Sequence, residues 1–286
     1  MQLSQGSDYD VSVMSKDELK IAIGWAELEG WNPGINDSDI FYETDPQGFL
    51  VGKLNQSPIS SISAVRYGDT FGFIGFYIVH PDARHQGYGI QIWQRAIEIL
   101  EGRTIGLDGV VAQQENYQKS GFTFAHRNIR FAGISDRADQ LHPDLVPLSA
   151  IPFEQLKQCD RRFFPEQREQ FLRAWIDQPD AQSMGILQGD RLCAYGVIRA
   201  CHTGYKIGPL NAETPDLADA LIQALMATIP LGSTFYLDVP EPNPQAIELA
   251  QKYKMKPAFE TARMYRGCSP ELPLGQIFGI TSFELG

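Results

Sequence analysis

The chain has 286 residues, 43% of them hydrophobic, and carries a formal net charge of -11 at pH 7. This length predicts about two domains, and the hydrophobic content is enough for packed cores, which argues against a disordered chain. Because proteins bind nucleic acids with clustered Lys and Arg, the acidic balance also argues against a DNA or RNA partner.

The N-terminal stretch MQLSQGSDYD has neither the basic start nor the apolar centre of a signal peptide. No segment approaches the roughly 20 apolar residues that cross a bilayer. The four cysteines form no CxxC pair, and no histidine lies at metal-ligand spacing. We therefore expect a cytoplasmic protein with no metal ion and no membrane partner.

The first half of the chain alternates between strand and helix patterns. A strand over DYDVSV precedes Ser15 and, three residues later, Glu18, a pair typical of the capping box that begins a helix. Residues 48–79 hold three extended runs separated by NQSP and YGDT, which predicts an antiparallel meander. Helices are expected at 16–29, 89–101 and 112–119, and further strands at 103–109 and 121–133.

A polar stretch with three prolines, ISDRADQLHPDLVPLSAIP, separates the halves. The second half then repeats the order of the first, which indicates duplication of one α/β fold. The predicted division is a domain over 1–134, a linker over 135–148 and a domain over 149–286. The second half is predicted to be helical at 153–176, a strand meander at 183–210, helical at 215–226, a strand at 233–240, helical at 244–253 and extended thereafter.

The segment YIVHPDARHQGYGIQIW joins the last strand of the first meander to a helix. The N–H groups in the first turn of a helix have no partner within the helix, and the helix dipole adds positive charge there. Gly87 and Gly89 would let a ligand approach the backbone without meeting a Cβ atom. The segment therefore predicts a phosphate site built from backbone amides.

Several interpretations of this loop compete. A P-loop would carry a Lys directly after its last Gly, and a dinucleotide fingerprint would carry a third Gly where Ile92 stands. An ordinary glycine-rich turn is the plainest alternative. The pattern R-x-x-G-x-G, formed by Arg84, Gly87 and Gly89 after an apolar strand and a proline, resembles the acyl-CoA pyrophosphate loop of the GNAT superfamily of N-acetyltransferases.

A second motif supports this resemblance. The segment ENYQKSGFTF carries Tyr117 three residues before a small residue and the pair Gly121-Phe122, as GNAT proteins do beside the thiol of CoA. In the second half, the segments GPL, LDVPEPN and RMYRG are similar to those of tandem GNAT proteins. The resemblance implies an α/β (α+β) fold of two tandem GNAT-like domains, each with a mixed, mostly antiparallel central sheet flanked by helices.

The resemblance also implies how acetyl-CoA would be held as co-substrate. Backbone groups at the end of the strand would bond the pantetheine and the thioester oxygen, and the loop amides would bind the pyrophosphate. The implied cofactor-binding residues are Tyr77, Ile78, Val79, Arg84, His85, Gln86, Gly87, Tyr88, Gly89 and Ile90.

Acyl transfer to an amine further needs an acid for the leaving thiolate and a base for the amine. The resemblance implies Tyr117 as the acid and a strand N–H near Val79 as the donor to the oxyanion. Many family members carry a Glu on the strand before the loop, where Gly75 and Phe76 stand here. We take Glu29, beside the unusual segment WAELEGWNPG, as the catalytic base. Further candidates are Glu27, Asp108, His80 and a chain of water molecules.

The second half lacks these features. It has no R-x-x-G-x-G motif, and Ala250 stands where its acid would be, so we expect only the first half to catalyse. Its charged residues Arg199, Asp238 and Arg263 are expected to form structural ion pairs rather than to face a ligand.

These patterns predict an acetyl-CoA-dependent N-acetyltransferase that acts on a small-molecule amine. The alternative is an acyl-CoA-binding sensor without turnover. It is motivated by the missing strand Glu and by Val110, which stands where the family carries an Asn. A scaffold of two α/β domains with no CoA binding is the third hypothesis.

Overall fold

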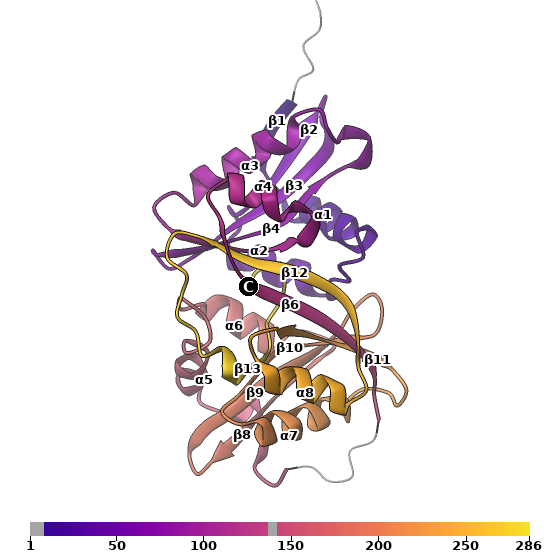
Figure 1. Cartoon of the computed structure of the whole chain (residues 1–286), viewed down its shortest axis with the longest axis vertical. Coiled ribbons are helices and arrows are strands. Elements are labelled where there is room, and N and C mark those ends of the chain that lie inside the picture. Colours follow the sequence, from indigo (N-terminus) through magenta and orange to yellow (C-terminus); the bar gives the residue numbers. More distant parts are fainter. Residues whose placement is uncertain (1–8, 137–141) are drawn as a thin grey trace, which may run out of the picture.

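The computed structural model describes residues 9–136 and 142–286. The first residues of the predicted N-terminal domain and residues 137–141 of the predicted linker lie outside the described residues. The two halves of the chain lie one above the other in Figure 1, with the C-terminal end between them. Within the described ranges, no helix is both long and apolar enough to cross a membrane.

The N-terminal half contains all the elements that its sequence predicts. Ser15 and Glu18 form the predicted capping box at the start of the first helix. The strands are β1 (Tyr9–Val13), β2 (Phe49–Leu54), β3 (Ser57–Tyr67), β4 (Phe71–Val79), β5 (Thr104–Val110) and β6 (Thr123–Ile134). The helices are α1 (Lys16–Leu28), α2 (Asp37–Thr44), α3 (Tyr88–Ile99) and α4 (Gln114–Lys119).

The C-terminal half repeats this order. The strands are β7 (Leu145–Pro147), β8 (Ala181–Gln188), β9 (Arg191–Ala200), β10 (Tyr205–Ala212), β11 (Thr234–Pro240), β12 (Lys256–Arg266) and β13 (Ile277–Gly279). The helices are α5 (Phe153–Asp160), α6 (Glu169–Ile176), α7 (Pro215–Met226) and α8 (Pro244–Lys252). The single helical run predicted over 153–176 is two helices, and the break between them contains Pro165, a residue that disfavours a continuous helix.

The short helix α2 was not predicted, because its sequence DSDIFYET is polar and carries no side-chain cap. Tertiary contacts hold it instead. Phe41 is fully buried and its ring stacks on that of Trp175 in α6, with centroids 6.0 Å apart. Asp37, at the start of α2, forms a buried ion pair with Arg199 of β9 (2.9 Å). Both contacts join the two halves of the chain.

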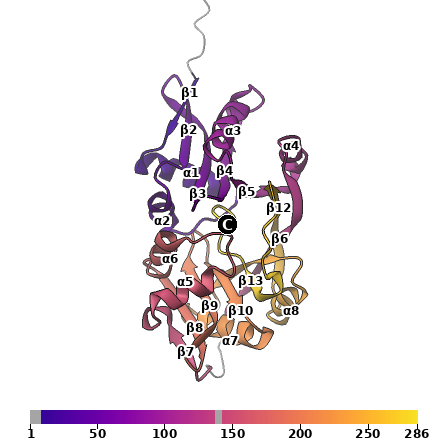
Figure 2. The same cartoon turned by 90° about the vertical axis from the view of Figure 1, so that its left-hand side faces the viewer.

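The strands exchange partners between the halves. The sheet runs β1-β2-β3-β4-β5-β12-β6-β11-β10-β9-β8-β7, so β12 of the second half lies between β5 and β6 of the first. Figures 1 and 2 both show β12 beside β6 between the two halves. The predicted mixed, mostly antiparallel sheet flanked by helices is confirmed, with parallel pairs only at β4–β5 and β10–β11 among the described strands. Each half is completed by a strand of the other.

Alternate residues of the N-terminal strands pack on opposite faces of the sheet. Val65 joins the hydrophobic cluster that contains α1 and α2 residues, whereas its neighbour Ala64 joins the cluster under α3. The charged residues that we expected to be structural are paired. Arg130 of β6 bonds Asp238 of β11 (2.6 Å), and both side chains are buried.

Strands β4 and β5 diverge halfway along their length. They pair from Phe71 to Ile74 on β4, and beyond Ile74 only β3 is paired with β4 among the described strands. Phe76 has a φ of 49° at the irregularity in the β3–β4 ladder, a conformation rare for a large side chain. The C-terminal segment, residues 280–286 after β13, enters at this divergence, because a Cβ atom added to Gly75 would lie 2.1 Å from the backbone oxygen of Glu284.

His126 on β6 makes stability depend on pH. Burial, followed by the nearby charge of Arg263, lowers its pKa from 6.5 to about 4. The unfolded chain therefore binds a proton at a higher pH than the folded chain does. The stabilising contribution of neutral His126 is complete above pH 6.5 and is lost as the pH falls through 4. We expect this residue alone to lower the free energy of unfolding by about 3 kcal/mol between pH 7 and pH 4.

Urea unfolding of the His126→Gln variant at both pH values tests this expectation. The variant should lose less stability on acidification than the unchanged protein, since glutamine does not titrate. His142→Gln, which alters a histidine whose side chain is not buried, serves as the control. Equal acid sensitivity of the His126 variant and the unchanged protein would contradict the assignment.

Candidate active site

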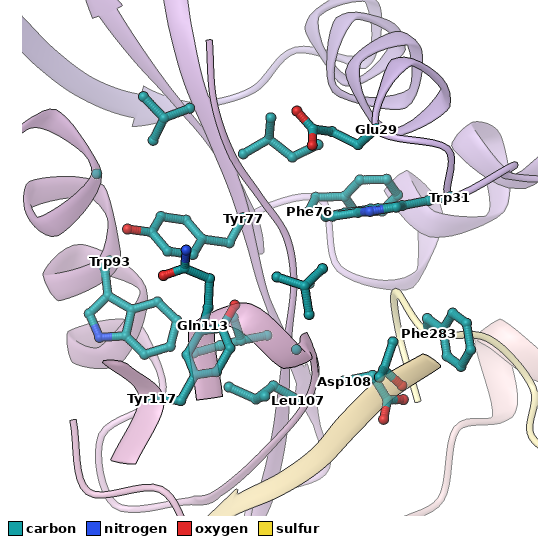
Figure 3. Close-up of a pocket in the computed structure, with 18 of the residues that line it drawn as sticks. Glu29, Trp31, Phe76, Tyr77, Trp93, Leu107, Asp108, Gln113, Tyr117 and Phe283 are labelled. Atoms are coloured by element: carbon teal, nitrogen blue, oxygen red, sulfur yellow. The ribbon is translucent and has the colours of Figure 1, made fainter. Parts of the chain in front are cut away.

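A cavity of about 510 Å³ opens where β4 and β5 diverge. Figure 3 shows Tyr77, Trp93 and Tyr117 on one side of it and Trp31 and Phe283 on the other. The first group comes from β4, α3 and α4, and the second from the α1–α2 connection and the C-terminal segment. The cavity therefore has one wall of residues close together in the sequence and one wall assembled from both halves.

The predicted phosphate loop lies at the cavity where α3 begins. Gly87 is the N-cap of α3 with a φ of 85°, and no side chain caps the helix. His85 also has a positive φ, 62°. Such conformations turn successive backbone N–H groups toward one point, as anion-binding loops do. The first-turn amides of α3 thus lack a side-chain acceptor.

The two loop glycines act differently. A Cβ atom on Gly87 would meet nothing within 4 Å, so the loop is open on that side. A Cβ atom on Gly89 would lie 2.8 Å from the Tyr77 hydroxyl and 3.2 Å from a Val79 methyl, so glycine there lets α3 approach β4 closely. The loop around Gly87 fits a diphosphate group, because its backbone N–H donors are accessible and no side chain fills the space beside Gly87.

The other predicted loop residues divide into two sets. Arg84, His85 and Ile90 line the cavity. Gln86 and Tyr88 are not among the lining residues: Gln86 donates to the Asp82 carbonyl (2.8 Å), and the Tyr88 ring lies 4.8 Å from that of Tyr9.

Strand β4 offers a free edge to the cavity. Tyr77, Ile78 and Val79 all line it, and on the side away from β3 no described strand pairs with them. The Val79 carbonyl accepts a hydrogen bond from Arg84 Nε (2.9 Å). A free edge of this kind can bond an extended ligand in the way it would bond a further strand.

Tyr117 of α4 reaches the same cavity. Its ring lies 5.5 Å from the ring of Trp93, and it packs so closely on β5 that a Cβ atom on Gly109 would come within 2.2 Å of it. Only 7% of the residue is exposed, and burial raises the pKa of Tyr117 above its usual value. The hydroxyl is therefore protonated at neutral pH, as a proton donor must be.

The predicted candidates for the base are dispersed. Glu29 lines the cavity and is bonded to Arg84, whereas Glu27 pairs with His202 outside it. Figure 3 shows Glu29 near Trp31.

The third carboxylate, Asp108, also lines the cavity. However, both of its oxygens are engaged, by Arg263 (2.9 and 2.6 Å) and by Asn128 (2.7 Å). The last candidate for the base, His80, does not line the cavity. Its Nδ1 lies 3.8 Å from Oδ2 of Asp82.

Residues of the second half complete the cavity, and the sequence did not reveal them. Phe259 and Thr261 come from β12, and Phe283 and Glu284 come from the C-terminal segment. They reach the site only through the strand exchange, which leaves no local signal in the sequence. Glu284 is 2% exposed, and neither carboxylate oxygen has a hydrogen-bond partner among the described residues.

The second half does not repeat the phosphate loop. Helix α7 begins with Thr214, whose side chain accepts a hydrogen bond from the Leu217 amide (3.3 Å), and Pro215 has no N–H to offer. The N-terminus of this helix is thus capped by the protein itself. Across residues 9–136 and 142–286, no three His, Cys, Asp or Glu side chains gather as a metal site would.

Comparisons with known proteins agree with these features. Residues 18–122 match the profile described as "Acetyltransferase (GNAT) family", and residues 156–279 match "Acetyltransferase (GNAT) domain". A protein of Pseudoalteromonas sp. (strain SANK 73390) named holothin acyltransferase is 32% identical over 95% of this chain and 92% of its own.

Solved structures share the fold. A proposed acetyltransferase of Pyrococcus horikoshii superposes with a TM-score of 0.83 at 22% identity, over 100% of this chain and 98% of its own. A tandem GNAT protein from the clavulanic acid biosynthesis pathway gives a TM-score of 0.64 at 13% identity, over 92% and 100% of the two chains.

Proposed function

The chain belongs to the GNAT acetyltransferase family, with two GNAT domains in tandem, and we propose that it is an acetyl-CoA-dependent N-acetyltransferase that acts on a primary amine of a small molecule. One observation carries the proposal: the uncapped start of α3, the free edge of β4 and Tyr117 all line the same cavity. The likeness to a protein named as an acyltransferase supports acyl transfer.

The N-terminal half holds the donor. Amides of His85 to Ile90 bind the diphosphate, and the backbone of Tyr77 to Val79 bonds the pantetheine arm along the free strand edge. Bound acetyl-CoA supplies the acetyl group as an activated thioester. A backbone N–H near Val79 donates to the oxyanion that forms on the thioester carbonyl.

The side chains move the protons. Glu29 accepts a proton from the ammonium form of the amine, and the freed lone pair then bonds to the carbonyl carbon. The C–S bond breaks, and the nitrogen gives its remaining surplus proton to water. Tyr117 gives its hydroxyl proton to the leaving thiolate, and the raised pKa of Tyr117 keeps that proton available over the physiological pH range. The products are an amide and free CoA.

The alternative function is an acyl-CoA sensor without turnover. Gly75 and Phe76 provide no carboxylate on β4, and Arg84 already holds the Glu29 side chain, which favours this alternative. The hydroxyl of Tyr117 at the cavity favours turnover, because binding alone needs no acid there.

A calorimetric titration with CoA and a thiol-release assay separate these hypotheses. The enzyme should bind CoA, and acetyl-CoA should release thiol only when an amine from a panel of small primary amines is present. Binding without amine-dependent thiol release would favour the sensor. If CoA does not bind, both the enzyme and the sensor are excluded and only a scaffold remains.

A further inference from the structure

Glu284 carries a buried carboxylate that the protein leaves without a hydrogen bond. The residue is 2% exposed and lines the cavity, and both oxygens lack a partner among the described residues. Leaving a charge buried and unbonded is costly unless something else completes its hydrogen bonds. This arrangement is typical of a group that a ligand satisfies.

The backbone around Glu284 is firmly held. Its carbonyl lies against Gly75, where even one added carbon would collide with it. The next residue, Leu285, accepts a hydrogen bond from the Tyr67 hydroxyl (3.0 Å) and donates its amide to Ser282 Oγ (3.0 Å). Glu284 is therefore fixed at the point where β4 and β5 diverge.

The other carboxylates at the cavity are already paired. Glu29 is bonded to Arg84, and Asp108 is bonded to Arg263. Glu284 is thus the unpaired acid among the described lining residues. An incoming cation would find its free acceptor there.

Three buried cationic side chains interact electrostatically with Glu284, but their hydrogen bonds go to other groups. The side chain of Arg130 donates to Asp238 and to the Trp31 carbonyl, and Lys206 donates to the Asn32 carbonyl. Arg199 bonds Asp37 and keeps one free nitrogen, Nη1. These cations compensate the charge of Glu284 without filling the hydrogen-bond positions of its carboxylate.

The surrounding wall is aromatic. Trp31 and Phe283 line the cavity on the side away from Tyr117 (Figure 3), and the ring of Phe259, which also lines it, lies 6.0 Å from that of Phe283. Aromatic rings attract cations and pack against apolar groups. On the premise of the proposed function, we propose that Glu284 binds the ammonium group of the acceptor, so that the enzyme selects protonated amines carried on an apolar body.

Binding to the CoA-saturated protein tests this proposal with two probes of similar shape, 2-phenylethylamine and 2-phenylethanol. The unchanged protein should bind the amine on the order of 10²-fold more tightly than the alcohol, measured by calorimetry at pH 7. Glu284→Gln should reduce this preference to within a few-fold, because the amide carries no charge. Glu284→Asp keeps the charge and should recover part of the preference.

Glu260→Gln is the matched control, since Glu260 is an exposed acid of β12 next to lining residue Thr261. It should leave the preference unchanged. The proposal is overturned if the unchanged protein does not prefer the amine, or if Glu284→Gln keeps the preference. Failure of the proposed function gives a different result. The protein then does not bind CoA, or it does not release thiol from acetyl-CoA, and neither outcome depends on how the two probes bind.

Discussion

Replacing Tyr117 by phenylalanine is expected to lower kcat by a factor of about 10² to 10⁴, the range that a positioned general acid contributes. The dissociation constant for CoA should stay close to that of the unchanged protein, because the ring still packs against Trp93 and Gly109. Steady-state kinetics with acetyl-CoA and CoA calorimetry measure the two effects separately.

The leaving group provides a sharper test of the same role. A thioester of an acidic thiol, such as thiophenol, needs little help from an acid, so the loss in Tyr117→Phe should shrink with that donor. Tyr253→Phe, in the C-terminal half, removes a hydroxyl that bonds Asp219 and does not line the cavity, and should keep normal turnover. If the loss in Tyr117→Phe is the same with both donors, Tyr117 does not protonate the thiolate.

The pH dependence follows from burial. A general acid acts only in its protonated form, so turnover falls at pH values above its pKa. Burial raises the pKa of Tyr117, which moves that fall to higher pH. We therefore expect no loss of kcat from this group between pH 7 and pH 9.

The sequence indicates the part of the cavity that we propose holds the acyl donor, because its signals are local. Arg84, Gly87 and Gly89 lie within one loop, and a strand end, a loop and a helix start are adjacent in any fold that contains them. Tyr117 requires one further step, the resemblance to a known motif. In the structure, Arg84, Gly87, Gly89 and Tyr117 line one cavity.

The part of the cavity that we propose holds the acceptor could not be predicted in the same way. Its residues Phe259 and Glu284 reach the cavity because β12 inserts beside β5 and the C-terminal segment follows it back to β4. Pairing between strands so distant in the sequence depends on the register of the whole sheet, to which no short pattern points. The same holds for α2, which is stabilised by Trp175 and Arg199 rather than by its own sequence.

Comparison of the two halves explains why the catalytic machinery is proposed for only one of them. Gly87 leaves the start of α3 uncapped, whereas Thr214 and Pro215 close the start of α7. The order of strand and helix is similar in both halves, so the difference lies in particular residues: those of this loop, and Ala250 in the second half, where the first half carries Tyr117. The start of α3 therefore offers the donors that a diphosphate needs, and a change there should act on cofactor binding directly.

Introducing glutamate at Gly87 is expected to weaken CoA binding by at least about 10²-fold, measured by calorimetry. A carboxylate beside the loop amides would compete for those donors and repel the diphosphate, and like charges placed together cost several kcal/mol. A Cβ atom added at Gly87 meets no protein atom within 4 Å, so the substitution begins without a steric clash.

Gly102→Glu separates this effect from backbone strain. Gly102 follows the C-terminal end of α3, has a φ of 81° against 85° at Gly87, and also has open space around it. Both variants therefore place a side chain at a similar unfavourable φ and add the same charge, but only the Gly87 variant places the charge at the proposed diphosphate site. Loss of CoA affinity confined to Gly87→Glu assigns the site to this loop, whereas equal affinity in the two variants rejects it.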